Sequence, residues 1–290
     1  MEGDQEKKLI WVVFYGVSAL GKTYFLKNFS EVCDAEKVCC QIISSDDCAK
    51  EAMDDEIKKN PLLTQTEAFE KTKKFHIKVF EEHIHKAVEN MKPGNNIIVL
   101  DKVMNGGKFL KDINKTFKPK CPTRLVALIP WSPHAFNYSH YGVVPMSEIL
   151  VANVCQRILT RDTHQTVDGT DLKKLFLALS FVKLYNGLKS FEEKKEEGNI
   201  EQFYSISFHQ EKPELLSLIP AKFLESLKKT LKELKPFQGE ETVCNELLAI
   251  MKEPTFEKEI EPILSFGDAE QQKTQIKSII ESFKDMGAPK

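Results

Sequence analysis

Arginine is scarce in this chain, which contains only Arg124, Arg157 and Arg161. Lysine therefore supplies most of the positive charge, and the formal net charge of −2 excludes a polybasic nucleic-acid binder. Any nucleic-acid contact must come from a local patch. Because a planar guanidinium can hold phosphate through two parallel hydrogen bonds and lysine cannot, the few arginines are candidates for phosphate contacts.

Long apolar runs are also missing, and no segment reaches the length of a membrane span. The first residues, MEGDQEKK, are charged and precede a predicted strand, so we do not expect a signal peptide. The seven cysteines are odd in number and lack zinc-site spacing, and the Cys39-Cys40 pair suits reduced core thiols. A composition of 41% hydrophobic and 29% charged residues indicates a globular protein, and we expect a reducing cytoplasmic or nuclear compartment.

The most informative stretch is residues 9–29. The apolar run from Leu9 to Tyr15 is typical of a central strand in a parallel sheet. It is followed by GVSALGKT, which matches the phosphate-binding pattern G-x-x-x-x-G-K-[ST], and then by an amphipathic helix. This order of strand, loop and helix predicts a nucleoside triphosphate site.

Each part of this loop has a physical role. Gly16 and Gly21 allow a tight turn, so that backbone N–H groups and the start of a helix face the phosphates. Lys22 would reach the β- and γ-phosphates, and the Thr23 hydroxyl would bind Mg²⁺. The candidate nucleotide-binding residues are Gly16, Ser18, Gly21, Lys22, Thr23 and Tyr24.

Strands and helices alternate through the first two-thirds of the chain. Further strands are predicted at 38–44, 96–101, 124–129 (closed by Pro130) and 203–208, and helices at 62–91, 108–117, 147–160 and 171–188. This alternation predicts an α/β fold, a P-loop NTPase-type parallel sheet with helices on both faces. From about residue 213 we expect only helices, at 213–234, 240–252, 256–265 and 268–286. The predicted domains are therefore residues 1–210, with a lid around 155–170, and a helical C-terminal appendage over 211–290.

Carboxylates follow two of these strands. Asp46 and Asp47 come just after the second strand, where one of them could accept a proton from an attacking hydroxyl. Alternatively, Ser45, Asp46 or Asp47 caps a helix. Asp101 ends the third strand, where an aspartate can hold Mg²⁺. Lys102 and Asn105 follow in a loop that could meet the acceptor.

Two of the three arginines, Arg157 and Arg161, lie four residues apart near the end of a predicted helix. We expect them to bind phosphate, the alternative being a surface salt-bridge pair. A local basic patch of Lys108, Lys111, Lys115, Lys118, Lys120 and Arg124 could bind an RNA acceptor, and Trp131, Phe136, Tyr138 and Tyr141 could stack a base. A solvated helix face and a packed loop are the alternatives.

Taken together, GVSALGKT, SSDD, VLDK, RILTRDTHQT and FLALSFVKLYN resemble the 5′-hydroxyl polynucleotide kinase family, and most of all the kinase domain of fungal-type tRNA ligases. The likeness spans about residues 9–190. It implies that Asp46 is the general base, that Asp101 lies near the metal and that Arg157 and Arg161 form a lid over the donor phosphates. Thr163 stands where the family usually has asparagine.

The sequence thus favours a Mg²⁺-dependent kinase that moves the γ-phosphate of ATP or GTP to a 5′-hydroxyl end of RNA or DNA. Catalysis would involve Lys22, Asp46, Arg157 and Arg161, with Thr23 and Asp101 at the metal and Asp47, Lys102 and Asn105 at the acceptor. Two alternatives stay open. One is a kinase of the same fold acting on a nucleoside, sugar or metabolite, and the other is a non-catalytic nucleotide-binding scaffold.

Overall fold

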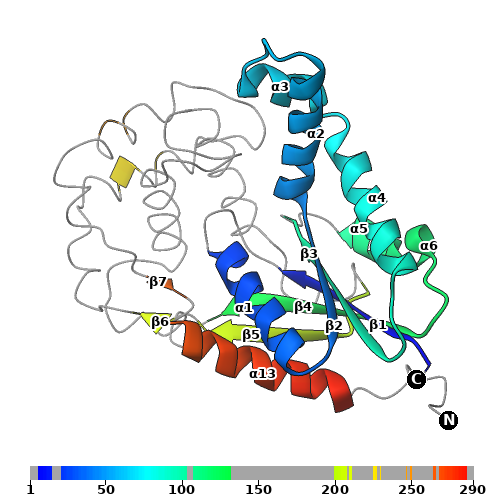
Figure 1. Cartoon of the computed structure of the whole chain (residues 1–290). Coiled ribbons are helices and arrows are strands. Elements are labelled where there is room, and N and C mark those ends of the chain that lie inside the picture. The colour runs from blue at the N-terminus through cyan, green and yellow to red at the C-terminus, as the bar shows by residue number, and fades with distance from the viewer. Residues whose placement is uncertain are drawn as a thin grey trace.

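The computed structural model describes residues 6–14, 21–102, 107–131, 199–207, 209–210, 264–265 and 268–285, with five isolated positions between 225 and 249. Within these residues the chain forms a five-stranded parallel sheet with helices, which confirms the predicted α/β fold (Figure 1). The strand order is β2-β3-β1-β4-β5. These strands are Cys39–Ser44, Asn95–Asp101, Lys8–Phe14, Thr123–Trp131 and Gln202–Ser207.

The central strand, β1, pairs with β3 on one side and with β4 on the other. The chain first runs from β1 to the edge strand β2, returns to β3 and then crosses β1 to reach β4. The direction of winding therefore reverses around β1. In open parallel sheets ligands bind at such a reversal, beyond the carboxyl ends of the strands.

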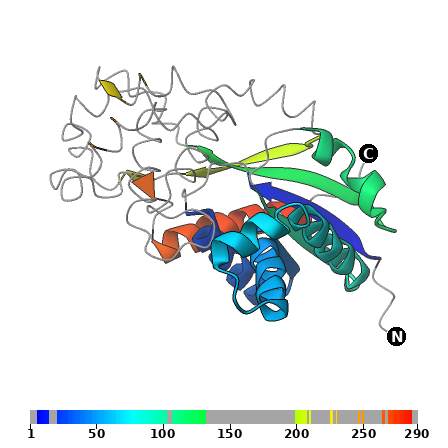
Figure 2. The same ribbon diagram turned by 90° about the horizontal axis from the view of Figure 1, so that it is seen from above.

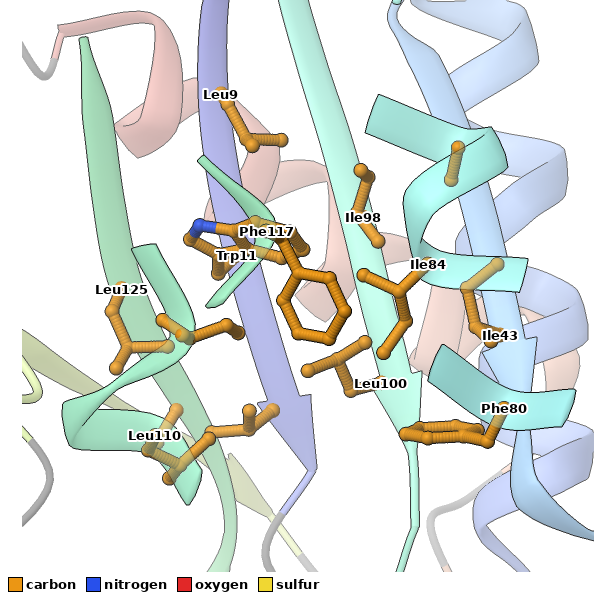
Figure 3. Close-up of a cluster of buried hydrophobic side chains, with 14 of the residues drawn as sticks. Leu9, Trp11, Ile43, Phe80, Ile84, Ile98, Leu100, Leu110, Phe117 and Leu125 are labelled. Atoms are coloured by element: carbon orange, nitrogen blue, oxygen red, sulfur yellow. The ribbon is translucent and has the colours of Figure 1, made fainter. Parts of the chain in front are cut away.

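One face of the sheet, called here the α4 face, is covered by helices that follow β2 and β3 in the chain. A single buried cluster joins alternate residues of β1, β3 and β4 to these helices. In Figure 3, Phe117 lies against Trp11 in the middle of this cluster, with ring centroids 6.0 Å apart. The helices are α4 (His76–Glu89), α5 (Gly107–Lys111) and α6 (Ile113–Phe117).

The opposite face, called the α1 face, is covered by α1 (Lys22–Ala35) and α13 (Ala269–Asp285). Phe14 and Phe25 meet edge-to-face with centroids 5.5 Å apart, and Phe283 of α13 meets Tyr204 of β5 at 5.2 Å. The orange-red α13 lies beside the blue α1 in both ribbon views (Figures 1 and 2). Helix α13, which lies near the end of the printed sequence, thus packs beside α1, the helix that follows β1, and the two together cover this face.

Several element predictions need correction. Residues 62–91 form two helices, α3 (Gln65–Thr72) and α4, rather than one. A helix directly after β2 was predicted only as the alternative in which Ser45, Asp46 or Asp47 caps it, and the structure has α2 there, over Ser45–Lys59. Strand β4 continues through Pro130 to Trp131, where Pro130 pairs with Ile206 of the neighbouring β5.

The expectation of helices only beyond residue 213 is also wrong, because Leu264–Ser265 (β7) pairs antiparallel with His209–Gln210 (β6). The helix expected over 268–286 is confirmed by α13. Those expected over 147–160 and 171–188 lie outside the described residues, as does most of 211–263, so the domain boundary near residue 211 stays a prediction.

Candidate functional site

The carboxyl ends of β1, β2 and β3 meet at one edge of the sheet. Register pairing places Ser44, the last residue of β2, beside Asp101, the last residue of β3. On the other side of β3, Leu100 pairs with Val13, so the end of β1 lies at the same level. The sheet therefore brings together the segments on which the sequence placed the phosphate loop and the two carboxylate groups.

Gly21 shows the backbone conformation that the loop pattern requires. Its φ of 86° lies in the left-handed region, which favours glycine because it has no Cβ. Helix α1 begins at the next residue, and the Gly21 carbonyl accepts a hydrogen bond from Phe25 N at 3.1 Å. The helix start expected near Gly21 is thus confirmed, while Gly16 and Ser18 lie outside the described residues.

Lys22 is the first residue of α1 and only 8% exposed. An ammonium group at the amino end of a helix faces the positive end of the dipole, and burying it adds a desolvation cost. Such a placement needs nearby negative charge. By contrast, Thr23 and Tyr24 in the same turn are exposed, Tyr24 at 54%.

Asp101 supplies part of that negative charge. Burial raises the pKa of this carboxyl above its usual range, the charge of Lys22 opposes the increase, and Asp46 and Asp47 add to it. The charges of Lys22, Asp46 and Asp47 therefore all lie close enough to influence the Asp101 carboxyl. This clustering of opposite charges with a perturbed carboxyl is typical of sites that bind ions or transfer protons.

Asp46 and Asp47 lie in the first turn of α2, and both are exposed. The residue that caps this helix is Ser44, whose Oγ accepts a hydrogen bond from Asp47 N at 3.3 Å. The alternative that Ser45, Asp46 or Asp47 is the cap is therefore wrong. Within the described part of the chain, neither carboxylate is held by an ion pair or a side-chain hydrogen bond, so both can face a ligand.

Sequence reasoning missed the role of Ser44, although the Ser44-x-x-Asp47 spacing is a recognised capping signal. It also missed the surroundings of Lys102. The Lys102 ammonium lies 5.2 Å from the ring centroid of Phe80 and 5.7 Å from that of Phe109. No sequence signal links Phe80 to this lysine, because 22 positions separate them and only the fold brings them together.

Asn105, Arg157 and Arg161 lie outside the described residues, as do Phe136, Tyr138 and Tyr141. Arg124 of the predicted basic patch binds Glu201, with Nη1 and Oε2 3.0 Å apart, and its charge is thereby partly neutralised.

Among the described residues, no three His, Cys, Asp or Glu side chains converge as a metal site. The five described cysteines are free, and burial raises the pKa of the Cys48 thiol to about 11.

Comparison with known proteins yields no matching family model and no matching curated protein. In the part of the chain that the structure describes, every helix is too short or too polar to cross a bilayer.

Proposed function

We propose that this chain is a P-loop phosphotransferase that moves the γ-phosphate of ATP or GTP to a 5′-hydroxyl end of RNA or DNA. The observation that carries this proposal is the grouping of Lys22, Asp101 and the pair Asp46 and Asp47 at the carboxyl edge of the sheet. It supports a reaction that needs a cation for the donor phosphates, a carboxylate for Mg²⁺ and a second carboxylate for the acceptor.

On this proposal, the glycine turn before α1 and the start of that helix hold the donor phosphates, with Lys22 at the β- and γ-phosphates. Mg²⁺ commonly binds through one or two protein oxygens together with substrate phosphates and water. Thr23 and Asp101 are suited to this sparse coordination, and the ion would neutralise charge on the donor phosphates. Arg157 and Arg161 remain the proposed clasp over the migrating phosphoryl group.

Asp46 is proposed as the general base, because it is exposed at the amino end of α2 and free to accept the proton of a bound hydroxyl. Asp47, in the same turn, donates its backbone N–H to Ser44 and is assigned to orient the acceptor. Catalysis would then come mainly from positioning and charge stabilisation, as expected for phosphoryl transfer.

The test is transfer of labelled γ-phosphate from ATP or GTP to matched 5′-hydroxyl RNA, 5′-hydroxyl DNA and nucleosides. Asp46→Ala should lower kcat by roughly 10²- to 10⁴-fold, because a general base contributes about that much. Binding of the nucleotide should be unchanged. Asp54→Ala is the matched control, since Asp54 is an exposed aspartate two turns further along the same helix. Normal turnover in Asp46→Ala would contradict the role of Asp46, and wild-type transfer to none of the acceptors would contradict the kinase proposal.

A further inference from the structure

The end of α1 and the start of β2 bring two cysteines together. Helix α1 ends at Ala35, and the chain then reverses through Lys37, whose φ of 58° lies in the left-handed region. Val38 N donates a hydrogen bond to the Cys33 carbonyl at 2.9 Å, which closes the turn. Because the turn is so tight, Cys40 near the start of β2 lies beside the last turn of α1, which contains Cys33.

The alternation of side chains along β2 shows which face of the sheet carries Cys40. Gln41 Nε2 donates a hydrogen bond to the Ala87 carbonyl of α4 at 3.2 Å, so Gln41 belongs to the α4 face. Cys40 is the preceding residue of the strand and therefore belongs to the α1 face. Cys39 has the parity of Gln41 and lies on the α4 face. The α1 face thus holds Cys33 and Cys40 together, without Cys39.

The two thiols are in contact and differ in their access to solvent. The side chains of Cys33 and Cys40 lie within hydrogen-bond distance of each other. This hydrogen bond and the burial of Cys33, which is 0% exposed, raise the pKa of its thiol. Cys40 is half-buried on β2, an edge strand that pairs only with β3 in the described part of the sheet. An oxidant therefore reaches Cys40 first, with Cys33 held next to it.

We propose that this pair is a redox site, at which oxidised glutathione converts Cys33 and Cys40 into an intramolecular disulfide that fastens the end of α1 to β2. In the first step the Cys40 thiolate attacks one sulfur of the small disulfide, whose S–S bond breaks, and one small thiolate leaves. Cys33 then loses its proton, attacks the Cys40 sulfur and displaces the second small thiolate. The protein loses two electrons and two protons, and the two glutathione thiols gain them.

The first step makes the second easier. Because the hydrogen bond with Cys40 is the largest cause of the raised pKa of Cys33, converting Cys40 into a mixed disulfide removes that cause. The Cys33 sulfur also lies next to the sulfur that it must attack, which favours ring closure over attack by an external thiol. Cys33 and Lys22 lie at opposite ends of α1, so the inference goes beyond the proposed function and does not depend on it.

The experiment maps the cross-link by mass spectrometry. The folded full-length protein is incubated with oxidised glutathione, the remaining thiols are alkylated, and the chain is digested with trypsin without reductant. Cleavage after Lys37 leaves Cys33 in peptide 28–37 and Cys40 in peptide 38–50. The wild type should yield these two peptides joined and lighter by two hydrogen atoms than the free pair. Incubation of the folded protein with reduced glutathione should reverse the cross-link.

Three variants identify the partners, because peptide 38–50 also contains Cys39 and Cys48. Cys40→Ala should give no joined peptides. Cys33→Ala should stop at the first step and accumulate the mixed disulfide of Cys40 with glutathione. Cys39→Ala is the matched control, because it changes the neighbouring residue on the opposite face of the same strand, and it should keep the cross-link at the wild-type yield.

The cross-link should also raise the melting temperature of the wild type by roughly 5–10 °C, because it closes a short loop in the unfolded chain. Cys39→Ala should show the same increase and Cys40→Ala none. A folded wild type that stays reduced under conditions that oxidise the urea-unfolded chain would overturn the inference. So would joined peptides in Cys40→Ala, or an oxidised wild type that melts no higher than the reduced protein. If Cys33→Ala does not fold, the wild type and the two variants of β2 still decide between these outcomes.

Discussion

The two faces of the sheet are closed in different ways. The α4 face is covered by helices within residues 76–117, which lie close to their strands in sequence, and its contacts are mostly apolar. The α1 face joins segments far apart in sequence, and a buried hydrogen bond crosses it from Asn28 Nδ2 to Gln272 Oε1 at 2.9 Å. Both residues are less than 5% exposed.

Charged pairs border the buried amide contact. Lys273 binds Glu31 at 2.9 Å, and Lys277 and Lys284 both reach Glu36 at the end of α1. Apolar packing tolerates small shifts, whereas a buried amide pair is satisfied in only one register. Directional contacts thus help to fix the position of the helix that carries Lys22, just as the hydrogen bond from Trp11 Nε1 to Asn114 Oδ1 does for α6 on the other face. We conclude that the α4 face mainly supplies stability, whereas directional contacts on the α1 face fix the position of the helix that carries Lys22.

The largest effect should come from the α4 face. Phe117→Ala leaves a cavity against Trp11 and should lower the free energy of unfolding by about 3–5 kcal/mol, because a buried aromatic ring is lost. Denaturant unfolding followed by the fluorescence of the two tryptophans, Trp11 and Trp131, measures this change. Lys115→Ala, at an exposed position of α6, is the control and should differ little from the wild type. If Phe117→Ala lost less stability than Gln272→Ala, the α1-face variant described next, the conclusion that the α4 face mainly supplies stability would be contradicted.

A smaller effect is expected on the α1 face. Gln272→Ala removes the acceptor of the buried Asn28 amide and should cost about 1–3 kcal/mol, since a buried donor left unsatisfied pays its desolvation cost. Asn28→Leu combined with Gln272→Leu should recover part of the loss, because neither polar group is then buried. Lys273→Met, at a half-buried neighbouring position that pairs with Glu31, should change stability little, and less at high salt. Additive effects of the two leucine substitutions would show that the amide pair does not act as a unit.

The smallest change in stability should depend on pH and should come from Asp101, at the end of β3. Burial raises the pKa of Asp101, so the folded protein holds this proton more tightly than the unfolded chain. The stabilisation is fully present below about pH 4, the ordinary aspartate range, and is lost as pH rises through the raised pKa. Asp101→Asn should match the wild type in acid and be more stable at neutral pH. Unfolding curves of both proteins over this range test the sign, and a variant less stable at neutral pH would contradict it.

Much of this fold follows from local patterns in the sequence. The apolar runs that became β1, β3 and β4 were recognisable because strands buried on both faces leave a continuous signal. The extent of helix α2 was not recognisable, because only Cys48, Ala49 and Met53 are buried along its length and its apolar stripe is narrow. The break between α3 and α4 falls in Lys73-Lys74-Phe75, which contains no glycine or proline to mark it.

For the candidate site, the sequence predicted which residues lie at strand ends but not their surroundings. Asp46, Asp47 and Asp101 were placed by the general rule that ligands gather at the carboxyl edge of a parallel sheet. The burial of Lys22 became visible only in the folded chain, and the contact of Lys102 with Phe80 depends on α4, a helix that precedes β3 in the chain. Such long-range packing has no local signature, and neither does the pairing of two-residue strands such as β6 and β7.

The contact between Asn28 and Gln272 spans 244 positions of the chain, and this separation has a consequence during synthesis. A ribosome that has made the first five strands has still to add α13, so one side of α1 waits uncovered for several seconds at ordinary elongation rates. Closing so large a loop is slow, and the exposed apolar surface invites aggregation meanwhile. A newly made molecule would therefore complete the helical layer around α1 only once α13 has been synthesised, and until then the exposed apolar surface of α1 would be available to a chaperone.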